Sequence, residues 1–94
     1  MLPIAGYSDY EIEAWLSRLG SPPVECLKVA DLSASYEMTK CGILRLLNGQ
    51  FATVVEEGCS CYSSSDADIE LHPTYEAAWV SFQKWYKSRT RGND

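Results

Sequence analysis

The sequence has little positive charge, a single histidine and no long apolar run. It contains 8 Lys and Arg residues against 13 Asp and Glu residues, which gives a formal net charge of −5 at pH 7. Nonspecific affinity for nucleic acid comes from Lys and Arg contacts to phosphates, so this balance disfavours direct nucleic-acid binding. No run approaches the roughly 20 apolar residues that a membrane-spanning helix needs. We therefore expect neither a nucleic-acid nor a membrane partner.

The first residues also lack the features of a secretory signal. The stretch MLPIAGYSDYE has neither a basic region nor a long apolar segment. We therefore expect a cytoplasmic protein whose cysteines are reduced thiols. Four cysteines in 94 residues also fall below the density of a disulfide scaffold.

Apolar and aromatic residues, by contrast, are abundant. The hydrophobic fraction is 46%, with three Trp, six Tyr and two Phe residues, which indicates a folded chain. Ninety-four residues leave room for one hydrophobic core. We therefore expect residues 1–94 to form one domain, with residues 1–7 as a lead-in and residues 90–94 as a frayed tail.

A β-hairpin within residues 42–61 is the central prediction. Two apolar runs flank Asn48 and Gly49, a pair typical of the two-residue type I′ turn. Such a turn places Leu46 opposite Phe51. Because side chains alternate along a strand, one face of the hairpin would carry Leu44, Leu46, Phe51 and Val55.

A helix is predicted over residues 9–19. Ser8 is a good N-cap, and Glu11 three residues later completes a capping box. Gly20 supplies the left-handed conformation that ends many helices.

A second helix is predicted at the C-terminal end, where Thr74 can cap its first turn. Aromatic and small residues recur there at helical spacing, which favours one apolar stripe. The stripe contains Tyr75, Ala78, Trp79, Phe82 and Tyr86, with Trp85 at its edge.

The other segments are less regular. Residues 22–32 fit either a short buried helix or a strand, and a helix is the preferred interpretation. A strand begins near residue 36, and Gly42 is interpreted as a possible bulge within it. A third strand is predicted over residues 67–71, with Ile69 and Leu71 facing the core.

The predicted fold class is therefore α+β. It consists of a three-stranded antiparallel sheet with the C-terminal amphipathic helix packed on one face, together with an N-terminal helix. The helix stripe is expected to pack on the face formed by Leu44, Leu46, Phe51 and Val55.

Cys59 and Cys61 are the first candidates for chemistry. Two thiolates this close can offer two ligands to zinc, but structural zinc sites usually space their cysteines by two to four residues. The redox motif likewise has two residues between its cysteines. The preferred interpretation is that both pack as small apolar residues, so no metal or cofactor is expected. A small metal-binding or redox module remains the alternative function.

No set of residues predicts catalysis. His72 is the only histidine, and a Cys–His nucleophile pair needs an orienting third group that the sequence does not indicate. We expect His72 to lie in a turn before Pro73. The chain is therefore predicted not to be an enzyme.

The charge is unevenly distributed. Residues 1–76 contain twelve acidic and four basic residues, whereas residues 77–94 contain one acidic and four basic residues. An acidic surface favours association with a basic one. We therefore predict a non-enzymatic binding protein that occludes a basic surface of a partner protein. The predicted contact residues are Arg45, Gln50, Glu56, Glu57, Asp66, Asp68 and Glu70.

Two short segments, residues 58–62 and 74–79, loosely resemble small phage-encoded proteins. The acidic, compact character of the chain is similar to that of inhibitors carried by mobile elements. The resemblance implies an inhibitor-like role and no particular catalytic residue.

Overall fold

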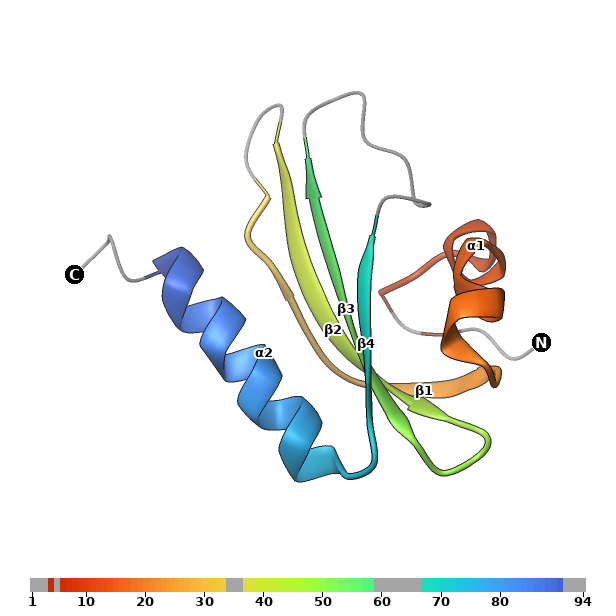
Figure 1. The fold of residues 1–94 in the computed structure, drawn as a ribbon. Helices are drawn as coiled ribbons and strands as arrows, with labels where there is room; N and C mark the ends of the chain where they lie inside the picture. The colour runs from red at the N-terminus through yellow and green to blue at the C-terminus, as the bar shows by residue number, and fades with distance from the viewer. Residues whose placement is uncertain (1–3, 5, 34–36, 59–66, 91–94) are drawn as a thin grey trace.

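The computed structural model describes residues 4, 6–33, 37–58 and 67–90. Within them, two helices cover opposite faces of one antiparallel sheet, whose strand order is β1-β2-β3-β4 (Figure 1). The α+β class and the antiparallel sheet are confirmed, but the sheet has four strands, so the prediction of three was wrong. The elements are α1 (Asp9–Leu19), β1 (Pro23–Asp31), β2 (Met38–Leu46), β3 (Phe51–Gly58), β4 (Asp68–His72) and α2 (Tyr75–Thr90). Neither helix is long and apolar enough to cross a membrane.

Helix α1 has the predicted bounds and the predicted caps. The Glu11 backbone N–H donates to Ser8 Oγ over 3.2 Å, and the Ser8 backbone N–H donates to Glu11 Oε1 over 3.0 Å. Gly20 follows the helix with φ 74°. These contacts join residues three apart in sequence, so the sequence alone can locate the start of this helix.

The extra strand is β1, so the preference for a helix at residues 22–32 was wrong. This segment pairs with β2 along its length, with register shifts between Pro23 and Glu25 and between Cys26 and Lys28. The apolar residues of this segment do not fall on one face of a helix, so a helix here would have no apolar stripe to pack. The hydrogen bonds that β2 supplies therefore favour the strand. Tertiary pairing decides such ambiguous segments.

The hairpin between β2 and β3 forms at the predicted place but with a different turn. Gly49 N–H donates to Leu46 O over 3.0 Å, and Leu46 N–H donates to Gln50 O over 2.9 Å. The loop therefore has three residues, with Gly49 at φ 90°, as in the common three-residue hairpin that ends in a left-handed glycine. The Asn48 side chain favours this form because its Oδ1 accepts the Gln50 N–H over 3.0 Å.

The longer loop shifts the register by one residue. Arg45, not Leu46, lies opposite Phe51, so the predicted register was wrong. A shift of one residue moves side chains to the other face of the sheet. The predicted apolar face therefore divides in two. Leu44, Leu46, Ala52 and Val54 pack with α1, whereas Cys41, Ile43, Phe51 and Val55 pack with α2.

Gly42 does not mark a bulge. It pairs in regular register with Val29 on β1 and Val54 on β3. A Cβ atom at this position would lie 2.1 Å from Tyr7 Oη. Glycine is required here because the Tyr7 ring lies directly over the strand. Tyr7 and Ile4 of the predicted lead-in are both buried in the α1 cluster.

The C-terminal elements follow their predictions with small corrections. Thr74 caps α2, because its Oγ1 accepts the Ala77 backbone N–H over 3.2 Å. The prediction that Leu71 faces the core was wrong, because β4 is a sheet edge and Leu71 is 43% exposed. Ile69 faces a core, but it packs against the α1 cluster instead of the C-terminal helix.

Candidate functional site

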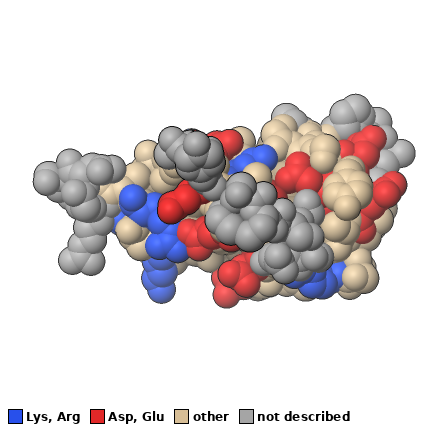
Figure 2. Space-filling model, turned by 90° about the horizontal axis from the view of Figure 1, so that it is seen from above, with Lys and Arg blue, Asp and Glu red and all other residues tan. Residues whose placement is uncertain are grey.

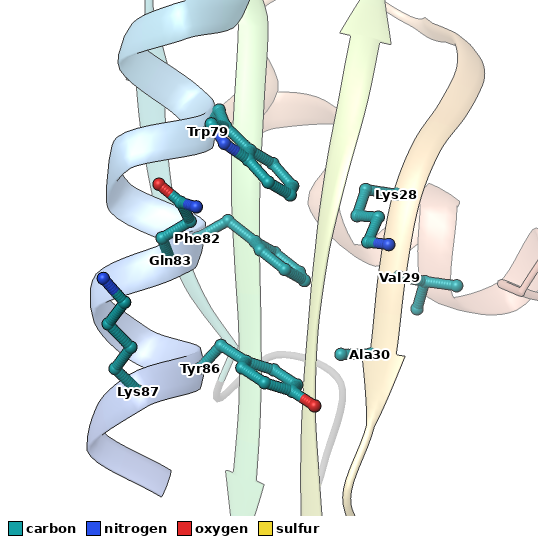
Figure 3. Close-up of a pocket in the computed structure, with 8 residues that line it drawn as sticks. All are labelled: Lys28, Val29, Ala30, Trp79, Phe82, Gln83, Tyr86 and Lys87. Atoms are coloured by element: carbon teal, nitrogen blue, oxygen red, sulfur yellow. The ribbon is translucent and has the colours of Figure 1, made fainter. Parts of the chain in front are cut away.

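A groove lies between α2 and the edge strand β1, with a volume of about 480 Å³. Figure 3 shows Trp79, Phe82 and Tyr86 pointing from α2 toward β1, with Lys28 on the facing strand. The strand side also supplies Val29 and Ala30, and the helix side also supplies Gln83 and Lys87.

Stacked aromatic rings form the helix wall of the groove. Within the wall, ring centroids lie 5.5 Å apart for Trp79 and Phe82 and 6.3 Å apart for Phe82 and Tyr86. Tyr75, which does not line the groove, continues the stack with its centroid 6.4 Å from that of Trp79. The interplanar angles are 10° to 17°, because residues three and four apart lie on one side of a helix. Phe82 is 3% exposed, whereas Tyr86 is 42% exposed. The wall thus contains a buried ring, that of Phe82, and a solvent-exposed ring, that of Tyr86.

Two lysines border this apolar wall. Lys28 Nζ lies 6.0 Å from the centroid of the Trp79 ring, which is cation–π distance. Lys87 lies one turn beyond Gln83 on α2 (Figure 3). Figure 2 shows the largest cluster of basic side chains at the end of the molecule where α2 ends, and acidic side chains spread over the rest of that view. The groove is therefore a locally basic part of an acidic chain.

Glu57 is the acidic residue that α2 neutralises. Its carboxylate accepts hydrogen bonds from the Arg89 guanidinium and, over 3.3 Å, from Trp85 Nε1. The Arg89 hydrogen bond lowers the pKa of the Glu57 carboxyl below its ordinary value. Glu57 was predicted as a partner contact, but in the structure it holds α2 against β3.

The other predicted contact residues do not form one surface. Arg45 forms an ion pair with Glu25 over 3.1 Å, on the β1 side of the sheet. Gln50 is exposed beside the hairpin turn. Glu56 is only 1% exposed, so its prediction as a docking residue is corrected: β3 turns it toward the α1 side of the sheet. Asp66 lies outside the described residues.

Asp68 and Glu70 remain together on β4. Both line a shallow hollow of about 300 Å³ between β4 and α2, which also involves Thr53 and Ser81. Glu70 Oε1 accepts a hydrogen bond from Ser81 Oγ over 2.9 Å and lies 3.2 Å from His72 Nε2. Both residues are exposed, and of the two Glu70 is the one bonded to Ser81.

His72 ends β4 instead of lying in a turn, so that prediction is corrected. It is 8% exposed, and its Nε2 lies 3.0 Å from Thr53 Oγ1 as well as near Glu70. Both contacts use the same ring nitrogen, and the Ser81 hydroxyl donates to Glu70 rather than to the imidazole. This geometry differs from a nucleophile–base–carboxylate chain, in which the imidazole lies between the other two groups. The contacts of His72 and Glu70 with Thr53 and Ser81 instead join β4 to β3 and α2.

The cysteines that the structure describes have the environment of packed thiols. Burial raises the pKa of Cys41 to about 12 and also raises the pKa of Cys26. Because the thiolate is the reactive form, such thiols react slowly. Cys59 and Cys61 lie outside the described residues. Within the described ranges no three His, Cys, Asp or Glu side chains cluster as metal ligands.

The groove was not predicted from the sequence, because the residues of both its walls were assigned to other parts of the fold. Residues 28–30 fell in the segment taken for a helix, and the aromatic stripe was assigned wholly to the core. Comparisons with protein-family models, with curated proteins and with solved structures find no match for this chain.

Proposed function

We propose that the chain is a non-enzymatic binding protein that holds a partner protein in the groove between β1 and α2. The observation that carries this proposal is the open aromatic wall, in which Tyr86 is 42% exposed beside a half-buried Trp79. Tyr and Trp are enriched at the energetic centres of protein interfaces, because they offer large apolar area at low entropic cost.

The polar groups elsewhere favour binding over catalysis. His72, Glu70 and Ser81 are linked in an order that leaves the serine hydroxyl bonded to a carboxylate. The high pKa of Cys41 disfavours a thiolate nucleophile. The contacts of these groups within the fold account for their positions. The groove aromatics, by contrast, keep part of their surface in solvent, which packing of the fold alone does not explain.

A comparative capture experiment tests the proposal. The chain and two variants, Tyr86→Ala and Tyr10→Ala, are immobilised and exposed to extract of the source cell, and bound proteins are quantified by mass spectrometry. Tyr10 is a matched control because it is 77% exposed on α1, on the far side of the sheet. A specific partner should lose at least about tenfold in retention on Tyr86→Ala, since interface tyrosines often contribute about 2 kcal/mol or more.

Circular dichroism and thermal unfolding of both variants establish that each is folded. Equal retention of every bound protein by the wild type and Tyr86→Ala would remove the groove as the binding site.

The acidic strand β4 is a second candidate contact. Exposed Asp68, beside Glu70, forms an acidic sheet edge that suits a basic partner surface, as an inhibitor-like protein of a mobile element would use. In the same capture experiment, Asp68→Lys is compared with Glu13→Lys, an equal charge change at an exposed site of α1. Loss of a partner on Asp68→Lys alone supports this contact, and equal retention on the two variants excludes it.

A further inference from the structure

We propose that the groove receives an extended, acidic segment of the partner, which pairs with β1 as a fifth strand of the sheet. This inference rests on the proposed function, because it names the chemistry of the partner that the groove holds. Three features carry it: the free edge of β1, the shape of the groove and the position of two lysines.

The edge of β1 gives the segment its backbone conformation. The strand order places β1 at the end of the sheet, with β2 on one side and no described strand on the other. Residues Lys28 to Asp31 pair with β2 in regular register, whereas the register shifts lie before Lys28. Bulges discourage strand addition, so the regular part can accept about four or five residues of an added strand. This part of β1 borders the groove.

The groove then selects one large apolar side chain. An added strand presents alternate side chains to the α2 side of the sheet. The side chain that lies beside Ala30 on that side contacts the wall formed by Trp79, Phe82 and Tyr86. About 480 Å³ is at the scale of pockets that enclose small ligands or a few side chains. An aromatic or branched apolar residue fills such a space against ring faces.

The lysines select acidic residues on either side of that apolar one. Lys28 comes from the strand and Lys87 from the helix, and both line the groove. In Figure 3 the Lys87 side chain extends along α2 on the side away from β1. Neither lysine forms an ion pair with a described residue, because the ion pairs there join Arg45 with Glu25, His72 with Glu70 and Arg89 with Glu57. Residues two apart in a strand share a face. The favoured pattern is therefore acidic–x–apolar–x–acidic.

Selection from a displayed library of random twelve-residue peptides tests this pattern. The library is panned against the full chain and, in parallel, against Tyr86→Ala and the double variant Lys28→Glu/Lys87→Glu. Lys84→Glu is the charge control at an exposed α2 site outside the groove, with a charge change of −2 against −4 for the double variant. We expect enriched peptides with an apolar residue between acidic ones. They should lose at least about tenfold in affinity on Tyr86→Ala and on the double variant, and keep it on Lys84→Glu.

The outcomes separate the two proposals. Peptides that depend on Tyr86 but are neutral or basic, or that bind the double lysine variant equally well, overturn the acidic pattern and leave the proposed function standing. Failure to enrich any peptide that depends on Tyr86 overturns both.

The strand geometry has its own measurement. An enriched peptide should slow hydrogen exchange at outward-facing backbone amides of residues 28–31, as a paired strand does. Unchanged exchange there with full peptide binding overturns strand addition. Tyr86-dependent binding of a twelve-residue oligothymidine, or Tyr86-dependent dimerisation in sedimentation, would replace the proposed occupant with nucleic acid or a second copy of the chain.

Discussion

The α1 side of the sheet and its α2 side differ in how completely they are closed. On the α1 side, Ile12, Trp15 and Leu19 pack on the β2–β3 hairpin and are at most 1% exposed. On the α2 side, the buried residues of the helix are Ala78, Phe82 and Trp85. Tyr75 and Tyr86, on the same stripe, remain more than one-third exposed. One side thus closes a core, whereas the other keeps apolar area beyond what its own packing covers.

This difference separates stability from recognition. Fully buried side chains contribute most to folding, because their transfer from water and their contacts are both complete. Half-exposed aromatics contribute less to folding and retain area that a partner can cover. The predictions below test this division, beginning with the largest expected effect.

The largest difference is expected between one tryptophan from each side of the sheet, Trp15 on α1 and Trp79 on α2. Trp15→Ala should lower the free energy of unfolding by about 3–5 kcal/mol, because Trp15 is fully buried. Trp79→Ala should cost at least about 1 kcal/mol less, since the Trp79 ring is already partly in water. Urea unfolding of both variants measures this, and equal losses would contradict the division.

Gly42→Ala should destabilise the closed side by steric overlap. Its new Cβ would meet Tyr7 Oη at 2.1 Å and Tyr7 Cζ at 2.9 Å, and overpacking of this kind costs about 1–3 kcal/mol. Thermal unfolding measures the loss. The double variant Gly42→Ala/Tyr7→Phe should recover part of it, because neighbouring sites couple. Strict additivity of the two changes would show that the Tyr7 hydroxyl is not the obstacle.

Tyr7→Phe alone should be neutral or stabilising by up to about 1 kcal/mol. The Tyr7 hydroxyl is buried and has no hydrogen-bond partner among the described residues, and burial raises its pKa well above the ordinary tyrosine value. Removing an unsatisfied polar group recovers part of its desolvation cost. Urea unfolding at pH 7 measures the sign, and a clear loss would indicate that the hydroxyl is bonded.

The ion pair of the open side should have the smallest effect. Arg89 lowers the pKa of Glu57, so its contribution is fully present above the ordinary carboxyl pKa and is lost as pH falls through the lowered folded-state value. Arg89→Gln should cost less than about 1 kcal/mol at pH 7, because both side chains are at least one-third exposed.

Urea unfolding of the wild type and Arg89→Gln at pH 7 and pH 2 tests this, with Lys84→Gln as the control for loss of a cation from the same helix. A difference that persists undiminished at pH 2 would exclude the ion pair as its cause.

Local signals in the sequence located the helices and the hairpin. Ser8, Glu11 and Gly20 specify α1 through contacts within a few residues, and Thr74 does the same for α2. Asn48 and Gly49 locate the chain reversal, because few residues other than glycine readily adopt the conformation of Gly49.

Local signals of this kind do not predict the candidate site. Asp68 and Glu70 were correctly placed on one face of a strand, but the groove needed the position of Lys28 relative to Trp79. These residues are about fifty positions apart, and no local pattern records that β1 is a strand. Glu56 and Glu57 are adjacent in sequence, yet one is buried and the other bonded to Arg89.

The sequence alone determined where the chain turns, where its helices begin and which segments are apolar, because these depend on φ preferences and on hydrogen bonds between near neighbours. Only the tertiary structure decided the hairpin register, the strand character of residues 23–31 and the division of apolar residues between the two helices. Each of these depends on which strand lies alongside, and a one-residue change in that pairing sends a side chain to the opposite side of the sheet.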